Sequence, residues 1–131
     1  MSTIKANTLL AADGSTTTQP SIPALDKRMA KAWVNFNGQG TVAIKDSYNV
    51  SSITDGGAGI YTVNFTNAMA NTDYSVSTGA FYNGTGFDDP LIVAQDDSQT
   101  TTTTALPIYV YRPMSSALTD VYKCFLQVFG D

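Results

Sequence analysis

The chain has 131 residues, enough for one domain with its own core, and 43% of them are hydrophobic while only 14% are charged. A net charge of −4 argues against a nucleic-acid-binding protein, which needs a basic face to release counterions from phosphates. The absence of histidine removes the Ser-His-Asp and Cys-His constellations and the commonest zinc ligand. All eleven acidic residues are aspartate, which favours turns over helices, so the composition predicts an all-β protein.

Hydrophobic runs in the chain are short and interrupted. None approaches the roughly 18 apolar residues of a membrane-spanning helix, so we expect no insertion into a membrane. The start of the chain also lacks the continuous apolar core of a secretory signal. The single cysteine, Cys124, excludes an intrachain disulfide, and its hydrophobic neighbours predict a buried side chain and not a reactive thiol.

Residues 1–30 are predicted to form an N-terminal arm and linker outside the β domain. Asp13-Gly14 is a turn signal, and residues 15–20 form a Ser-Thr run of low complexity that cannot offset the entropy of its own ordering. We therefore expect the arm to dock on its own domain, on a sister subunit or on a larger assembly. The apolar side chains available for docking are Ile4, Leu9, Leu10 and Ile22. Residues 23–30 fit a helical turn opened by proline and fit an extended linker equally well.

Residues 31–131 are predicted to form one antiparallel β-sandwich of about seven or eight strands. The runs 32–36 and 61–65 alternate apolar and polar residues, as half-buried strands do. Short strands at even spacing, separated by turns rich in Gly, Asn and Asp, are typical of sandwiches and barrels. We place the strands near residues 31–37, 41–46, 48–54, 59–66, 73–82, 90–95, 104–112 and 120–129.

Two of these strands have features that predict their place in a sheet. Pro107 cannot donate a ladder hydrogen bond, which suggests an edge or a bulge. The last strand, residues 121–129, is apolar on both faces, so it should be central or should face a neighbouring subunit. The predicted core contains either Trp33 or Val34, together with Phe36, Val42, Ile44, Val63, Phe65, Val76, Ile92, Val110, Phe125, Leu126 and Val128.

The stretch 32–65 also resembles a known viral module. The residues that carry the resemblance are Trp33-Val34-Asn35-Phe36-Asn37-Gly38, Val42-Ala43-Ile44, Tyr48-Asn49-Val50-Ser51-Ser52-Ile53-Thr54-Asp55 and Tyr61-Thr62-Val63-Asn64-Phe65. They look like a module of tail-fibre and other virion proteins of tailed bacteriophages, marine and cyanobacterial phages among them. The opening Ser2-Thr3-Ile4-Lys5-Ala6-Asn7, with Asp13-Gly14-Ser15, resembles the start of such fibre genes, so the resemblance covers about residues 1–75. It implies a structural and attachment role in a virion and brings no catalytic residues.

Paired aspartates are the sharpest acidic feature of the sequence. Asp88-Asp89 and Asp96-Asp97 lie on either side of the apolar run 91–93. Because neighbours on a strand point to opposite faces, one aspartate of each pair could converge on a common face. Such carboxylates could hold calcium, and a carboxylate pair also serves glycosidases, but solvated turns that cap one strand explain the same pattern. We therefore predict no catalytic residue and no cofactor, and we assign no metal site.

Five aromatic residues exceed what the predicted core can hold. They are Tyr82, Phe87, Tyr109, Tyr111 and Tyr122. Tyrosine with loop Asn and Asp is a common recognition surface, because the ring gives rigid contact area and the hydroxyl gives a hydrogen bond. We expect this set to pack between subunits or to contact a receptor, either a host surface glycan or a protein, and a homotrimer allows both.

The function predicted from the sequence is structural and not enzymatic. The leading hypothesis is a short tail-fibre or fibre-like module of a virion, made in the host cytoplasm, trimeric and held to other virion proteins by its N-terminal arm. The alternative is a capsid decoration or cement protein, with the arm and Lys27-Arg28 gripping the shell, because no long shaft separates arm from sandwich. A glycan-degrading enzyme is disfavoured by the missing histidine and glutamate.

Overall fold

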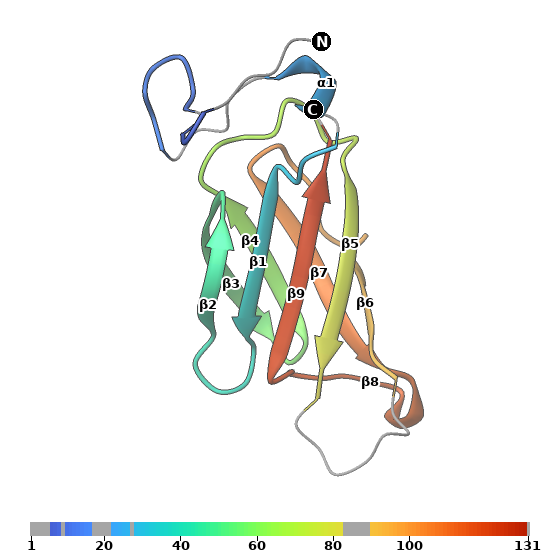
Figure 1. Cartoon of the computed structure of the whole chain (residues 1–131). Coiled ribbons are helices and arrows are strands. Elements are labelled where there is room, and N and C mark those ends of the chain that lie inside the picture. The colour runs from blue at the N-terminus through green and yellow to red at the C-terminus, as the bar shows by residue number, and fades with distance from the viewer. Residues whose placement is uncertain (1–5, 9, 17–21, 27, 83–89, 131) are drawn as a thin grey trace.

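Two antiparallel β-sheets packed face to face make up the protein (Figure 1). The computed structural model describes residues 6–8, 10–16, 22–26, 28–82 and 90–130. The first sheet has the strand order β2 (Ala43–Tyr48), β1 (Ala32–Asn37), β9 (Lys123–Phe129) and β5 (Ser75–Phe81). The second sheet has the order β3 (Val50–Gly57), β4 (Ile60–Phe65), β7 (Ala105–Arg112) and β6 (Ile92–Gln95), and the short β8 (Ala117–Leu118) pairs with β7. The predicted all-β antiparallel sandwich is confirmed.

The chain crosses from the first sheet to the second at Asn49, between β2 and β3. This residue has a φ of 55°, in the left-handed region that Asn tolerates better than most residues. Its side-chain nitrogen donates to the carbonyl oxygens of Lys31 (3.0 Å) and Asn67 (3.2 Å), and its Oδ1 accepts the Asn67 N–H at 2.7 Å. The crossing is therefore fixed by a side-chain amide, and strand periodicity gives no sign of it.

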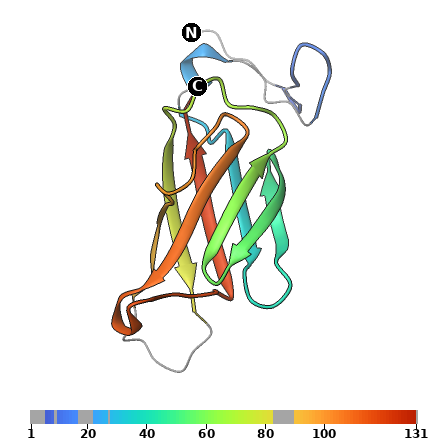
Figure 2. The same cartoon turned by 180° about the vertical axis from the view of Figure 1, so that it is seen from behind.

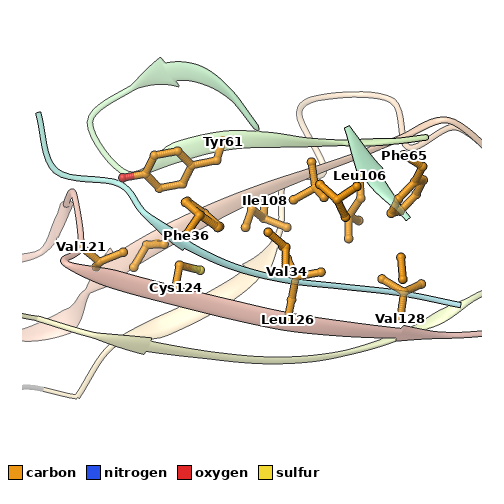
Figure 3. Close-up of a cluster of buried hydrophobic side chains, with 14 of the residues drawn as sticks. Val34, Phe36, Tyr61, Phe65, Leu106, Ile108, Val121, Cys124, Leu126 and Val128 are labelled. Carbon is orange, nitrogen blue, oxygen red and sulfur yellow. The ribbon is translucent and has the colours of Figure 1, made fainter. Parts of the chain in front are cut away.

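Every second residue of the four central strands points into the core (Figure 3). The inward rows are Ala32, Val34 and Phe36 from β1, Tyr61, Val63 and Phe65 from β4, Leu106, Ile108 and Val110 from β7, and Cys124, Leu126 and Val128 from β9. Burial of a large apolar side chain of this kind stabilises a fold by about 1.5–3 kcal/mol. The prediction that the last strand is central is confirmed, because β9 lies between β1 and β5.

Several residue-level expectations for these strands are wrong. Phe125 and Ile92, both predicted to lie in the core, are 45% and 46% exposed on the outer faces of their sheets. The alternation of the strand turns Phe125 outward, because its neighbours on β9, Cys124 and Leu126, point inward. The same alternation leaves Val34 in the core and turns Trp33 outward. Strand β2 ends at Tyr48, two residues later than the strand predicted at 41–46, and its pairing with β1 contains a register shift.

The expectation that Pro107 marks an edge or a bulge is also wrong. Pro107 is fully buried in β7, which lies between β4 and β6. Its carbonyl oxygen accepts the N–H of Asp96 at 3.0 Å, one residue past the end of β6. In an antiparallel strand the N–H and C=O of one residue point to the same neighbouring strand. The side of Pro107 that lacks an N–H therefore faces the end of β6, and no hydrogen bond between β7 and β4 is lost.

Tyr61 joins the two sheets at one end of the core (Figure 3). Its ring is fully buried and packs edge-on against Phe36, with the ring centroids 5.2 Å apart. Its hydroxyl donates towards the Asp120 carboxylate (2.9 Å) and the Gly38 carbonyl oxygen (3.2 Å), and the same Asp120 oxygen accepts the Gly59 N–H at 2.8 Å. Burial, and then the hydrogen bond to Asp120, raise the pKa of Tyr61, so the phenol stays protonated in the folded chain.

The described residues of the N-terminal arm, the short helix α1 (Pro23–Asp26) and the end of β9 lie at one end of the sandwich (Figure 1; Figure 2). The Gly14 N–H donates to the Ala11 carbonyl oxygen at 2.8 Å, which confirms the predicted turn. The helical interpretation of the linker is correct for one turn only. Of the predicted docking side chains, Leu10 is 43% exposed and Ile22 is half-buried beside α1, while Ile4 and Leu9 lie outside the described residues.

We predict that Tyr61→Phe lowers the free energy of unfolding by about 1–3 kcal/mol, because buried acceptors lose their donor. Urea denaturation followed by circular dichroism measures the change. Tyr109→Phe is the matched control, because Tyr109 lies on the outer face of the second sheet, and it should change the free energy by less than about 0.5 kcal/mol. Equal effects of the two substitutions would contradict the role assigned to the Tyr61 hydroxyl.

Candidate functional site

The four described aromatic residues that the sequence singled out lie in different parts of the sandwich. Tyr109 and Tyr111 lie half-buried on the outer face of the second sheet, on the central strand β7. Tyr111 pairs in register with Ile92 of β6 on one side and with Leu118 of β8 on the other. Phe87 lies outside the described residues.

Of the other two predicted tyrosines, Tyr82 directly follows β5 and Tyr122 directly precedes β9. These two strand ends lie at the end of the sandwich away from α1 (Figure 1), and each tyrosine contacts a cation. The Arg112 guanidinium lies 4.6 Å from the centroid of the Tyr82 ring. The Lys45 Nζ lies 4.3 Å from the centroid of the Tyr122 ring. Cation–π contacts at exposed sites contribute about 0.5–1 kcal/mol, so they orient these rings more than they stabilise the fold.

A second aromatic surface, not predicted from the sequence, covers the outer face of the first sheet. On β1, Trp33 pairs in register with Tyr48 of β2 and with Gln127 of β9. One pair further along, Phe125 of β9 lies next to Asn35, and Phe81 closes the face at the end of β5. We call this surface the aromatic face, and its members are Trp33, Asn35, Tyr48, Phe81, Phe125 and Gln127.

Phe125 lies at the centre of the aromatic face. The far edge of its ring occupies the space that a side chain at Gly79 of β5 would fill, since a Cβ there would overlap the ring. An aromatic ring laid over a glycine of the neighbouring strand covers exposed backbone and pins the register. Asn35, the neighbour of Phe125 on β1, has an Oδ1 that is out of contact with water and accepts no hydrogen bond from the described residues.

Charged side chains lie at the rim of the aromatic face. Asp46 on the edge strand β2 pairs in register with Asn35, and Lys123 at the start of β9 pairs with Phe81. Lys45, next to Asp46, is exposed and reaches Tyr122. An apolar centre with a charged rim is suited to binding.

One signal in the sequence could have located this face. In the run 32–37, alternation places Trp33 and Asn35 together on whichever side Val34 does not occupy. The same reasoning failed for β9, because Phe125 and Leu126 are both apolar. Only the pairing of β9 with β1 assigns Phe125 to the outer face.

The acidic pairs do not form a metal site in the described part of the chain. Both carboxylate oxygens of Asp96 accept hydrogen bonds within their own loop, from the Ser98 hydroxyl at 2.6 Å and from the Gln99 amide at 2.7 Å. These bonds lower the pKa of Asp96. No group of three metal-ligating side chains occurs among the described residues, and Asp88 and Asp89 lie outside them.

Cys124 is not a nucleophile in the folded chain. Its side chain is fully buried on the inner face of β9, and this burial raises the pKa of the thiol to about 12. The thiolate, which is the reactive form, is therefore scarce at neutral pH. The predicted role of Cys124 as a small buried hydrophobe agrees with this position.

Comparisons with protein-family models, with curated proteins and with solved structures found no match. Within the ranges that the structure describes, no helix is long and apolar enough to cross a bilayer.

We predict that Asp96→Asn lowers the melting temperature at neutral pH, because the amide cannot accept the Gln99 hydrogen bond in the same way. A carboxyl whose pKa is lower in the folded chain stabilises it above the unfolded value of about 3.9, and this contribution is lost as the pH falls through the folded pKa. The difference from the unsubstituted protein should therefore shrink in acid. Thermal melts between neutral pH and pH of about 2 measure it, with Asp97→Asn as control, and a difference that persists in acid would contradict the assignment.

Proposed function

We propose that this protein is a structural module of a bacteriophage virion, a short tail-fibre or fibre-like protein that serves host attachment. The observation that carries the proposal is the polarity of the molecule. The described part of the arm and α1 lie at one end of the sandwich, and the end of β5 and the start of β9 lie at the other (Figure 1). The cation-stacked tyrosines Tyr82 and Tyr122 adjoin these two strand ends. A module held at one end presents the loops of its far end outwards.

The sequence resemblance over residues 1–75 supports the same proposal. The two described side chains that could serve an enzyme are engaged otherwise: the Asp96 carboxylate is hydrogen-bonded within its own loop, and the Cys124 thiol is buried. We therefore propose a protein that acts by assembly and contact: it associates with itself as a homotrimer, docks on other virion proteins, and meets a glycan or protein of the host surface. Several copies on one particle would convert weak single contacts into avidity.

A second candidate is a capsid decoration or cement protein. It is favoured by the short distance along the chain between the arm and β1, which leaves no room for a fibre shaft. In this role the arm would grip the shell, and the end that carries Tyr82 and Tyr122 would face outwards in the same way. A glycan-degrading enzyme is the least favoured candidate, because the sequence has no histidine and no glutamate.

We predict that gold-labelled antibodies against this protein decorate the virus that encodes it, and that the label lies on the tail. Label on the head would favour the decoration protein, and particles without label would contradict both virion roles.

A second measurement uses the chain without residues 1–22. This variant should melt at nearly the same temperature as the full chain, because among the described residues the buried core begins at Ala32, yet it should fail to join the particle. Normal incorporation of the shortened chain would contradict docking by the arm.

A further inference from the structure

We infer that the aromatic face is the surface through which copies of this chain associate. The partner is a second copy of the chain, and the surface differs from the tyrosines of β7 that the sequence indicated. The inference rests on the proposed self-assembly and names the residues that perform it.

Exposed phenylalanine is the first argument. Phe81 is 61% exposed and Phe125 is 45% exposed, and both lie on the same side of the first sheet. Phenylalanine has no polar group that water can solvate, so two exposed rings on one face favour a partner that covers them. The two most exposed rings of this face are phenylalanines, which offer no hydroxyl or ring N–H to a polar ligand. A protein surface of the same kind covers them better than a glycan does.

The charged rim of the aromatic face is the second argument. Asp46 lies at this rim opposite Asn35, and Lys45 and Lys123 lie there as well. The lysines of one copy can therefore meet the aspartate of the next, so the face is complementary in charge to a second copy of itself.

The outer face of the second sheet is the competing surface. On β4 the Asn64 amide donates to the Ser52 hydroxyl oxygen (3.1 Å) and to the Thr54 hydroxyl oxygen (3.0 Å) of β3, so this half of the face is polar. The other half exposes Ile92 (46%) and Leu118 (40%) beside Tyr111, and the control substitution is placed at Ile92 for this reason.

The area of the aromatic face indicates how strongly two copies should associate. Four strands about 4.8 Å apart and seven residues long give a flat area of about 440 Å², from the standard strand spacing and rise. Stable interfaces bury about 800 Å² per partner, which is more than this face offers. We therefore expect weak association, in which the fraction of assembled chains rises with protein concentration.

The test compares the mass of the full chain with that of two variants, measured by light scattering over a wide concentration range. Phe125→Ser removes the central ring of the aromatic face. Ile92→Ser is the matched control, since Ile92 has almost the same exposure, 46%, but lies on the second sheet. We expect the unsubstituted chain and the control to associate alike, and Phe125→Ser to associate at least about tenfold more weakly, as loss of a central interface aromatic does. The only tryptophan, Trp33, lies on the face, so its emission should shift to the blue with concentration in all but Phe125→Ser.

Each outcome is decisive. If Phe125→Ser associates like the unsubstituted chain, the inference is wrong while self-assembly stands. If Ile92→Ser weakens association as much, the second sheet carries the interface and the inference is again wrong. If the unsubstituted chain is monomeric throughout, the proposed self-assembly fails and the inference fails with it. Should Phe125→Ser not fold, Phe81→Ser at the exposed end of β5 decides by the same criteria.

Discussion

A phenol hydroxyl buried between two sheets determines how this sandwich closes. Tyr61 belongs to the second sheet, Gly38 follows β1 of the first sheet, and Asp120 lies on the segment that returns the chain to β9. The Tyr61 hydroxyl hydrogen-bonds the other two groups; Tyr61 and Gly38 are buried, and Asp120 is half-buried. The backbone segments pack closely at this end of the core, and only glycine fits at position 59. The φ of Gly59 is 69°, and a Cβ there would lie 2.6 Å from the Val110 carbonyl oxygen.

This closure fixes the start of β9 and, through it, the outer face of the first sheet. The Gly38 N–H donates to the Val121 carbonyl oxygen at 2.8 Å, directly before β9 begins. From that point a strand with period two sends Cys124 and Leu126 inward and Phe125 outward. A shift of one residue would put Phe125 in the core and Leu126 in water, so the aromatic face depends on a hydrogen-bonded anchor at the other end of the connection.

Much of the architecture follows from the sequence, because alternation and turn residues act locally. The strand positions, the central place of β9 and the burial of Cys124 could all be predicted in this way. Other features depend on partners far apart in the chain. The inward row of β9 is undecided until β1 pairs with it, and the tolerance of β7 for Pro107 depends on where β6 ends.

The candidate site was harder to predict than the fold for the same reason. Tyrosines that are plentiful in the sequence separate onto different faces, because Tyr109 follows the alternation of β7 while Tyr122 lies outside any strand. The aromatic face assembles from β1, β2, β5 and β9, which only the sheet order brings together. No local motif marks such a surface.

These surfaces, and not a chemical centre, are where the proposed function lies. The arm at one end, the stacked tyrosines at the other and the aromatic face between them suit a module that is anchored, assembled and displayed. The most direct test of this account is a density map of the assembled protein that resolves which surface meets a neighbouring copy. The account predicts that Trp33, Asn35 and Phe125 are covered by another copy and that Tyr82 and Tyr122 point away from the anchored end. A map in which the aromatic face is open to solvent, with copies joined through the outer face of the second sheet, would contradict it.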